Sequence, residues 1–107
     1  MSAEALSVIQ ERMDGITVLC RRFGIVRLRL IGSAIRDDWK SATSDFDFLV
    51  DYGPPPDGIS ALDQLIKFEM ELSELLHSRV DTVDSKTPKN PFFLKHALPG
   101  AVELYDS

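Results

Sequence analysis

The sequence of 107 residues predicts an α+β fold: a small mixed β-sheet of about four strands with helices packed mainly on one face. Two long segments carry apolar residues at steps of three and four, which is the spacing of amphipathic helices. Four short segments alternate apolar with polar residues or are rich in β-branched residues, as strands are. At this length we expect residues 1–107 to form a single domain with one core.

The first expected helix covers residues 3–23, whose apolar residues make one stripe. Ser2 precedes it as a suitable N-cap. Gly24 follows Arg21-Arg22 and predicts the end of the helix, because glycine accepts the left-handed conformation that stops helices. Asp14-Gly15 weakens the middle of this segment and could divide it into two shorter helices.

Two strands and a stiff loop are expected next. Residues 26–30 alternate apolar with charged side chains, which predicts a strand with one buried face that ends at Gly32. Residues 46–50 alternate in the same way and predict the second strand. Residues 53–58 contain three consecutive prolines between two glycines, so this segment can be neither helix nor central strand.

A second helix should follow Ser60, which has the spacing of a capping box with Asp63. Its apolar surface is broad, and two interpretations stay open: all of it is core, or part of it is offered to a partner. The β-branched run at residues 79–83 predicts the third strand. Residues 92–98 are expected to form a short helix, and residues 101–105 the last strand.

Gly32-Ser33 and the later Asp45-Phe46-Asp47 carry most of the chemical information in the chain. The two acids stand two residues apart on one strand, so they share a face, roughly 6.6 Å apart at Cα, and can bind one divalent cation. Gly32 lacks a Cβ and lets the backbone approach an anion, while Ser33 adds a hydroxyl and an N–H. Because acids alone would repel a triphosphate, the combination predicts Mg²⁺ between them.

Asp81 is the best candidate for a third carboxylate at this site. It belongs to the expected strand at residues 79–83, which could lie beside the strand that carries Asp45 and Asp47. Asp84 is the second choice, because it falls off the alternation. Three carboxylates could hold two metal ions about 4 Å apart, which stabilise the attacking and leaving oxygens of an in-line displacement.

The order Gly-Ser, Asp-x-Asp and later Asp resembles the DNA-polymerase-β-type nucleotidyltransferase superfamily, and the small size resembles its minimal, MNT-type members. The stretches that carry the resemblance are residues 30–34, 44–50, 80–81 and 102–105. The resemblance implies that Gly32 and Ser33 hold the β- and γ-phosphates of ATP and that Asp45 and Asp47 bind two Mg²⁺ ions. It also implies that Asp81 binds metal and helps to activate the attacking hydroxyl.

Many minimal members are antitoxins that are encoded beside a HEPN-type RNase toxin, and some add AMP from ATP to a tyrosine of the toxin. The resemblance therefore implies an adenylyltransferase with a partner protein as acceptor. Two alternatives stay open. Members usually have a glycine where this chain has Asp37, so an inactive member could neutralise its partner by binding alone. Transfer to a small molecule such as an antibiotic is the other alternative.

The composition excludes several classes of protein. With 12 Lys and Arg against 17 Asp and Glu, the net charge is −5, which disfavours a nucleic-acid partner. Cys20 is the only cysteine, so neither an intrachain disulfide nor a thiolate zinc cluster can form. We expect no membrane segment and a cytoplasmic location. A homo-oligomer or a mixed oligomer is compatible with the sequence.

Overall fold

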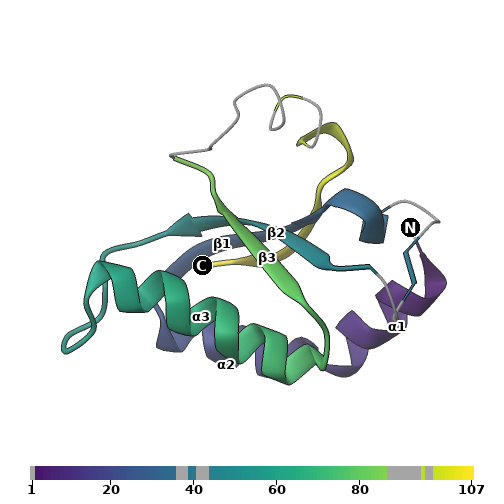
Figure 1. The fold of residues 1–107 in the computed structure, drawn as a ribbon. Coiled ribbons are helices and arrows are strands. Elements are labelled where there is room, and N and C mark those ends of the chain that lie inside the picture. The colour runs from purple at the N-terminus through teal and green to yellow at the C-terminus, as the bar shows by residue number, and fades with distance from the viewer. Residues whose placement is uncertain (1, 36–38, 41–43, 87–94, 96–97) are drawn as a thin grey trace.

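The structure is a computed structural model that describes residues 2–35, 39–40, 44–86, 95 and 98–107. Within these residues, three α-helices cover one face of a four-stranded sheet (Figure 1), as the sequence predicts. The elements in chain order are α1 (Ala3–Glu11), α2 (Met13–Arg22), β1 (Ile25–Ile31), the 3₁₀ turn η1 (Gly32–Ile35), β2 (Phe46–Tyr52), α3 (Ala61–Leu76), β3 (Val80–Asp84), the 3₁₀ turn η2 (Leu98–Gly100) and β4 (Val102–Asp106). The helix expected at residues 92–98 lies largely outside the described residues.

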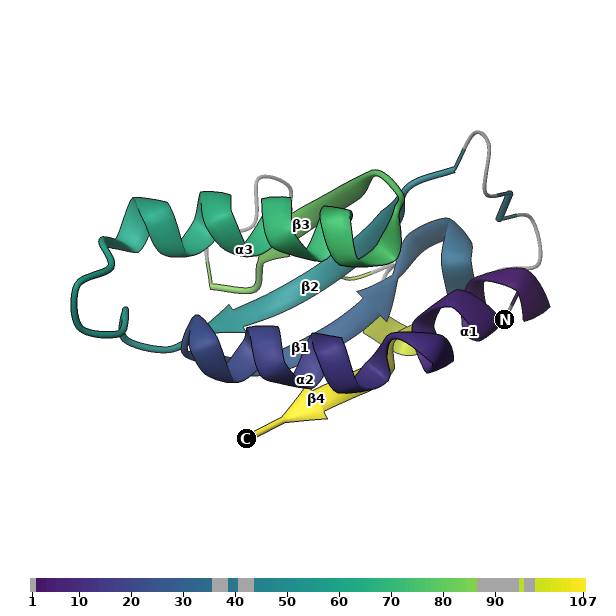
Figure 2. The same cartoon turned by 90° about the horizontal axis from the view of Figure 1, so that it is seen from below.

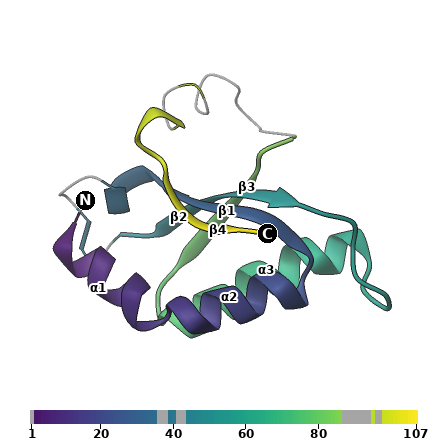
Figure 3. The ribbon, with the colours of Figure 1, turned by 180° about the vertical axis from the view of Figure 1, so that it is seen from behind.

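The sheet is mixed and open, with strand order β3-β2-β1-β4. β1 pairs antiparallel with β2 and β4, whereas β2 and β3 are parallel. Parallel neighbours need a crossover connection, and α3 supplies it. α2 and α3 lie side by side across the same face of the sheet (Figure 2). Figure 3 shows the same sheet from behind, with β4 beside β1 and the helices below the sheet.

The first expected helix is two helices, but the division falls at Arg12 and not at Asp14-Gly15. Arg12 ends α1 and begins α2 with a φ of −111°. Gly15 lies inside α2, where a Cβ would stand 2.8 Å from Leu75 Cδ1 of α3. This glycine therefore permits close packing of two helices instead of breaking one.

The predicted helix signals are confirmed. Ser2 Oγ accepts a hydrogen bond from the Ala5 N–H at 3.3 Å, and Ser60 Oγ accepts one from the Asp63 N–H at 3.0 Å. Gly24 has a φ of +68° directly after α2. Side-chain caps thus fix where helices α1 and α3 begin, and the backbone freedom of a glycine accompanies the end of α2.

β1 departs from the simple alternation expected for residues 26–30. Leu28 and Leu30 are fully buried as predicted, but Val26 is 42% exposed, and Ile25 is buried in its place. The pairing of β1 with β2 shifts register at this point. A β-bulge at Val26 accounts for the shift, because an extra residue moves the following side chains to the other face.

The core lies between the sheet and the helices. Phe46, Phe48 and Val50 of β2 are fully buried, and they share one cluster with Phe68 and Leu72 of α3. These strand residues alternate as the sequence predicts, so one face of β2 belongs entirely to the core.

The interpretation that the whole apolar surface of α3 is core is wrong. Leu62, Ile66 and Met70 are 63%, 49% and 55% exposed, and they follow one another at steps of four on the outer side of the helix. That this surface serves a partner stays a prediction. None of the helices in the described ranges has the length and apolar character that crossing a membrane requires.

Candidate active site

The two halves of the sequence motif meet in the fold. Gly32 follows the last residue of β1, Ile31, which pairs with Asp47 of β2. Gly32 has a φ of +76°, and a Cβ on it would overlap Asp47 Oδ2 and lie 3.0 Å from Asp47 Cγ. Only glycine fits both the backbone conformation and the space, so the carboxylate of Asp47 rests directly on the turn.

The turn η1, which contains Gly32 and Ser33, is contacted by a residue near the N-terminus and by one near the C-terminus. The Ser2 N–H donates a hydrogen bond to the carbonyl oxygen of Ala34 at 3.2 Å, and Ala34 is fully buried. On the other side, a Cβ on Gly100 of η2 would stand 2.9 Å from Ile35 Cδ1. The corner beside Asp47 is therefore held in place by α1 and η2.

Asp81 lies next to Asp47. The parallel register pairs these two residues, and Thr82 pairs with Phe48. Neighbouring strands are about 4.8 Å apart, and paired residues point to the same face. The prediction that the strand of Asp81 lies beside that of Asp47 is thus correct in its placement. Asp84 pairs with Val50 and so belongs to the helix-covered face, which leaves Asp81 as the carboxylate beside Asp47.

β3 is an edge strand, and α3 holds it in position. Both the backbone N–H and the hydroxyl of Thr82 donate hydrogen bonds to Glu69 of α3. At the start of the strand, the Phe46 N–H donates to the carbonyl oxygen of Arg79 at 2.9 Å. Glu69 therefore satisfies a donor of the strand and fixes the strand that presents Asp81.

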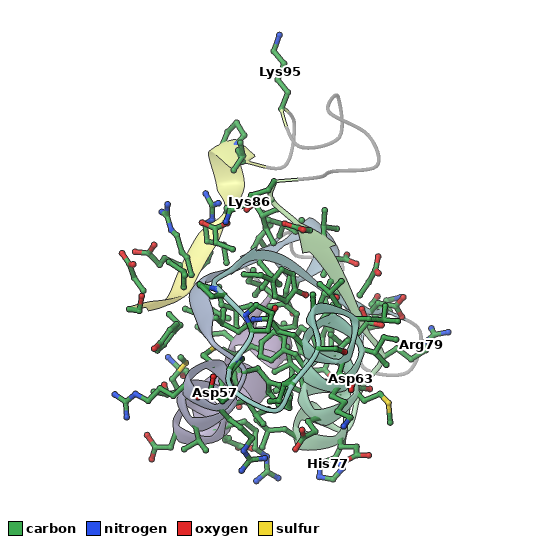
Figure 4. The ribbon with its side chains drawn as sticks, turned by 90° about the vertical axis from the view of Figure 1, so that its left-hand side faces the viewer. Asp57, Asp63, His77, Arg79, Lys86 and Lys95 are labelled. Carbon is green, nitrogen blue, oxygen red and sulfur yellow. The ribbon has the colours of Figure 1, made fainter. Side chains whose placement is uncertain are left out.

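Asp45 stands just before β2 and is turned toward Arg79. Its Oδ1 lies 2.9 Å from Arg79 Nε in an ion pair. Figure 4 shows the side chain of Arg79 on the outer side of the molecule, next to β3. Its carbonyl oxygen accepts a hydrogen bond from Trp39 Nε1 at 3.2 Å. Trp39 is only 3% exposed and stacks on Phe46, so it packs in the core and does not present a face to a nucleobase.

The three predicted carboxylates are not gathered as one cluster. Among the described residues, no group of three or more His, Cys, Asp or Glu side chains is placed to hold a metal ion. Asp47 and Asp81 are neighbours, whereas Asp45 is engaged with Arg79. Sequence reasoning missed Arg79: it is one residue from Val80, but only the parallel register shows that it stands beside Asp45.

The donor set fits Mg²⁺ better than a softer metal. Asp47 and Asp81 offer carboxylate oxygens, which Mg²⁺ prefers. Two like charges on paired residues repel, and a divalent cation between them relieves that repulsion. Gly32 lies in contact with the carboxylate of Asp47, so the glycine turn and the acidic pair adjoin each other.

The face of the sheet that carries these acids also carries buried apolar side chains and an ion pair. Ile31 and Leu49 are fully buried, although neither belongs to the core cluster on the helix side. Arg29 Nη2 lies 3.6 Å from Asp51 Oδ1. The carboxylates therefore stand on the face of the sheet opposite the helices, beside a small apolar floor. Asp37, the residue that departs from the usual family pattern, lies outside the described residues.

Comparison with known proteins shows the family of this chain. The sequence profile of the family described as "Nucleotidyltransferase domain" matches residues 13–102. Two proteins of Methanocaldococcus jannaschii, each named "Putative protein adenylyltransferase", are similar to this chain. One is 36% identical over 78 residues, which cover 73% of this chain and 74% of the relative. The other is 35% identical over 77 residues, covering 72% and 74%.

Solved structures show the same fold. One described as "Structure of putative minimal nucleotidyltransferase" superposes with a TM-score of 0.69 at 31% identity and covers 95% of both chains. A toxin–antitoxin structure with AMP-PNP has a TM-score of 0.63 at 20% identity, covering 89% of this chain and 73% of the other. At that identity the likeness concerns the fold alone.

An open mixed sheet with a glycine corner against paired carboxylates defines a nucleotidyltransferase-like protein. The family match spans most of the chain. This chain belongs to the nucleotidyltransferase family, and the resemblance to its minimal members is confirmed.

Proposed function

We propose that this protein is an Mg²⁺-dependent adenylyltransferase that moves AMP from ATP to a hydroxyl of a partner protein. The observation that carries the proposal is the placement of Asp47, which rests on Gly32 and pairs with Asp81. One carboxylate thus stands both at the turn expected to bind phosphates and at the strand expected to bind metal.

The roles of the side chains follow from their positions. Asp47 and Asp81 would hold the metal, and Asp45 would join them. Gly32 and Ser33 of η1 would bind the β- and γ-phosphates through the backbone N–H groups at the start of the turn. Bound Mg²⁺ would neutralise the triphosphate and lower the pKa of the attacking hydroxyl.

The transfer is an in-line displacement at the α-phosphorus. The hydroxyl oxygen of the acceptor forms a new bond to the α-phosphorus, and the bond from that phosphorus to the oxygen bridging to the β-phosphate breaks. Pyrophosphate leaves with the bridging oxygen, and the hydroxyl proton passes to water or to Asp81. The protein contributes chiefly by positioning the reactants and stabilising charge.

Two findings support a protein as the acceptor. The relatives in M. jannaschii carry the name protein adenylyltransferase, and a structural neighbour is part of a toxin–antitoxin structure. The toxin–antitoxin neighbour motivates a role as an antitoxin, and the resemblance to minimal family members motivates a HEPN-type toxin as the partner.

Labelled ATP tests the proposal. The protein is incubated with α-labelled ATP, Mg²⁺ and the product of the neighbouring gene, and also with a panel of aminoglycosides. We expect the label on the neighbouring gene product and not on the aminoglycosides. Label transfer that is absent, or that persists in Asp47→Asn, would contradict the proposal, and labelled aminoglycosides would indicate a small-molecule acceptor instead.

A second function is neutralisation of the partner by binding alone. The observation that favours it is the ion pair between Asp45 and Arg79, which engages a predicted metal ligand with a cation. The double substitution Asp45→Ala with Asp47→Ala separates the two functions in a toxin-rescue assay. An enzyme loses protection with this variant, whereas a binding antitoxin keeps it.

A further inference from the structure

Arg79 occupies a position at the site that the proposed chemistry does not use. Its side chain is 72% exposed, yet Nε lies 2.9 Å from Asp45 Oδ1. The hydrogen bond from the Phe46 N–H to the Arg79 carbonyl oxygen fixes the backbone of Arg79 directly beside Asp45. The ion pair is therefore built on a defined backbone contact between β2 and the start of β3.

The pair has an electrostatic reason. Asp45, Asp47 and Asp81 place three negative charges around the ends of two adjacent strands. Without a cation these charges repel one another, and the repulsion grows as the side chains converge. The guanidinium of Arg79, paired with the carboxylate of Asp45, reduces this repulsion when no metal is bound.

We infer that Arg79 is a positioning residue that competes with the metal for Asp45. In the metal-free protein it holds the Asp45 carboxylate away from Asp47 and Asp81, and metal binding requires this ion pair to open. The inference rests on the proposed function, because it takes Asp45 as a metal ligand.

The competition explains two observations together. Asp45 is engaged with Arg79, and the described residues contain no group of three ligands ready for a metal. If Asp45 is released from Arg79, its carboxylate becomes available to the neighbouring pair. The exposure of Arg79 lets its side chain turn into solvent or toward a bound anion without disturbing the core.

Mn²⁺ binding measured by EPR, with no nucleotide present, tests this inference. Arg79→Gln should bind Mn²⁺ about two- to fivefold more tightly than the wild type, since an exposed ion pair has a modest free energy. Arg79→Lys keeps the charge and should stay near the wild-type affinity. In the Asp45→Asn background, Arg79→Gln should have no further effect on the Mn²⁺ affinity.

Arg22→Gln is the matched control. Arg22 Nη1 forms an ion pair with Glu71 Oε1 at the same distance of 2.9 Å, on the helix side of the molecule. Both substitutions remove one positive charge and one exposed ion pair, so a general charge effect would tighten Mn²⁺ binding equally in both. The inference requires the larger effect from Arg79→Gln.

The outcomes separate the inference from the proposed function. Equal Mn²⁺ affinities for Arg79→Gln and Arg22→Gln would overturn the competition while leaving the metal site intact. Wild-type protein whose Mn²⁺ binding is absent, or does not weaken in Asp47→Asn, would overturn the metal site and the proposed function with it.

Discussion

The two faces of the sheet are built by the same strands but differ in composition. On β2, Phe46, Phe48 and Val50 point toward the helices and are fully buried, whereas Asp47 and Asp51 on the other face are partly exposed. Side chains alternate along a strand, so one step in the sequence moves from the core to the candidate site. Folding and chemistry should therefore respond to different substitutions within this one strand.

The separation is not complete. Leu49 lies between Asp47 and Asp51 and is fully buried on the site face, as is Ile31 of β1. These two residues form the apolar floor beside the acids. The site face thus contributes to stability near its centre and to chemistry at the end where Gly32 meets Asp47.

The largest loss of stability should come from a substitution on the helix-covered face of the sheet. Phe48→Ala removes a fully buried ring and should lower the free energy of unfolding by about 3–5 kcal/mol. Urea denaturation measures the change. Asp51→Ala, on the site face of the same strand, is the control; it removes the partly buried ion pair with Arg29 but no ring of the core, so we expect a smaller loss. Equal losses for the two variants would contradict the distinction between the faces.

Gly32→Ala should lower both the stability of the fold and the rate of adenylyl transfer. The left-handed conformation costs an alanine about 1–2 kcal/mol, and the new Cβ would also push the Asp47 carboxylate from its position. We expect the rate of adenylyl transfer to fall at least roughly tenfold, because catalytic groups tolerate little displacement.

Gly58→Ala is the matched control for Gly32→Ala. Gly58 has a φ of +82°, and a Cβ added to it would meet no atoms within 4 Å, so alanine there brings the same backbone strain without a clash. The free energy of unfolding should fall by a similar amount while the transfer rate stays unchanged. A similar loss of transfer in both variants would show that the contact with Asp47 is irrelevant.

A smaller change in stability should appear at high pH, and it comes from Tyr52 on the helix-covered face of the sheet. Burial raises the pKa of the Tyr52 hydroxyl from 10.0 to about 12; a hydrogen bond with Thr82 lowers it, and the charges of Asp84 and Glu69 raise it further. Between pH 10 and 12 the unfolded chain releases this proton and the folded chain keeps it. Stability is therefore complete below pH 10 and falls as the pH rises, by at most about 1.4 kcal/mol per pH unit.

Tyr52→Phe should remove this dependence. Thermal denaturation from pH 9 to 11.5 compares the two proteins, and the wild type should lose stability more steeply above pH 10. Parallel curves would show that the buried hydroxyl does not titrate differently in the folded state.

The sequence predicted what local patterns determine. Ser2 and Ser60 cap helices because their side chains reach nearby N–H groups, and the alternation at residues 46–50 alone separates the core from the acids. The motifs that contain Gly32 and Asp47 could also be recognised locally, because they are defined by residue type and spacing alone.

Features that depend on distant segments were missed. Gly15 looked like a helix breaker, because nothing local shows that Leu75 packs against it. The bulge at Val26 depends on pairing with β2, and the ion pair of Arg79 with Asp45 depends on the parallel register of β2 and β3. Tertiary contacts, and not local propensity, decide these positions.

The most direct test measures pyrophosphate release from ATP, with the acceptor present, as a function of Mg²⁺ concentration. Asp47→Asn and Asp81→Asn are compared with Asp51→Asn, which changes the same charge on the same face outside the site. We predict that the first two lose at least about 100-fold in rate, since metal coordination contributes several kcal/mol, while Asp51→Asn stays near the wild type. Folded Asp47→Asn protein that releases pyrophosphate at the wild-type rate would contradict the account.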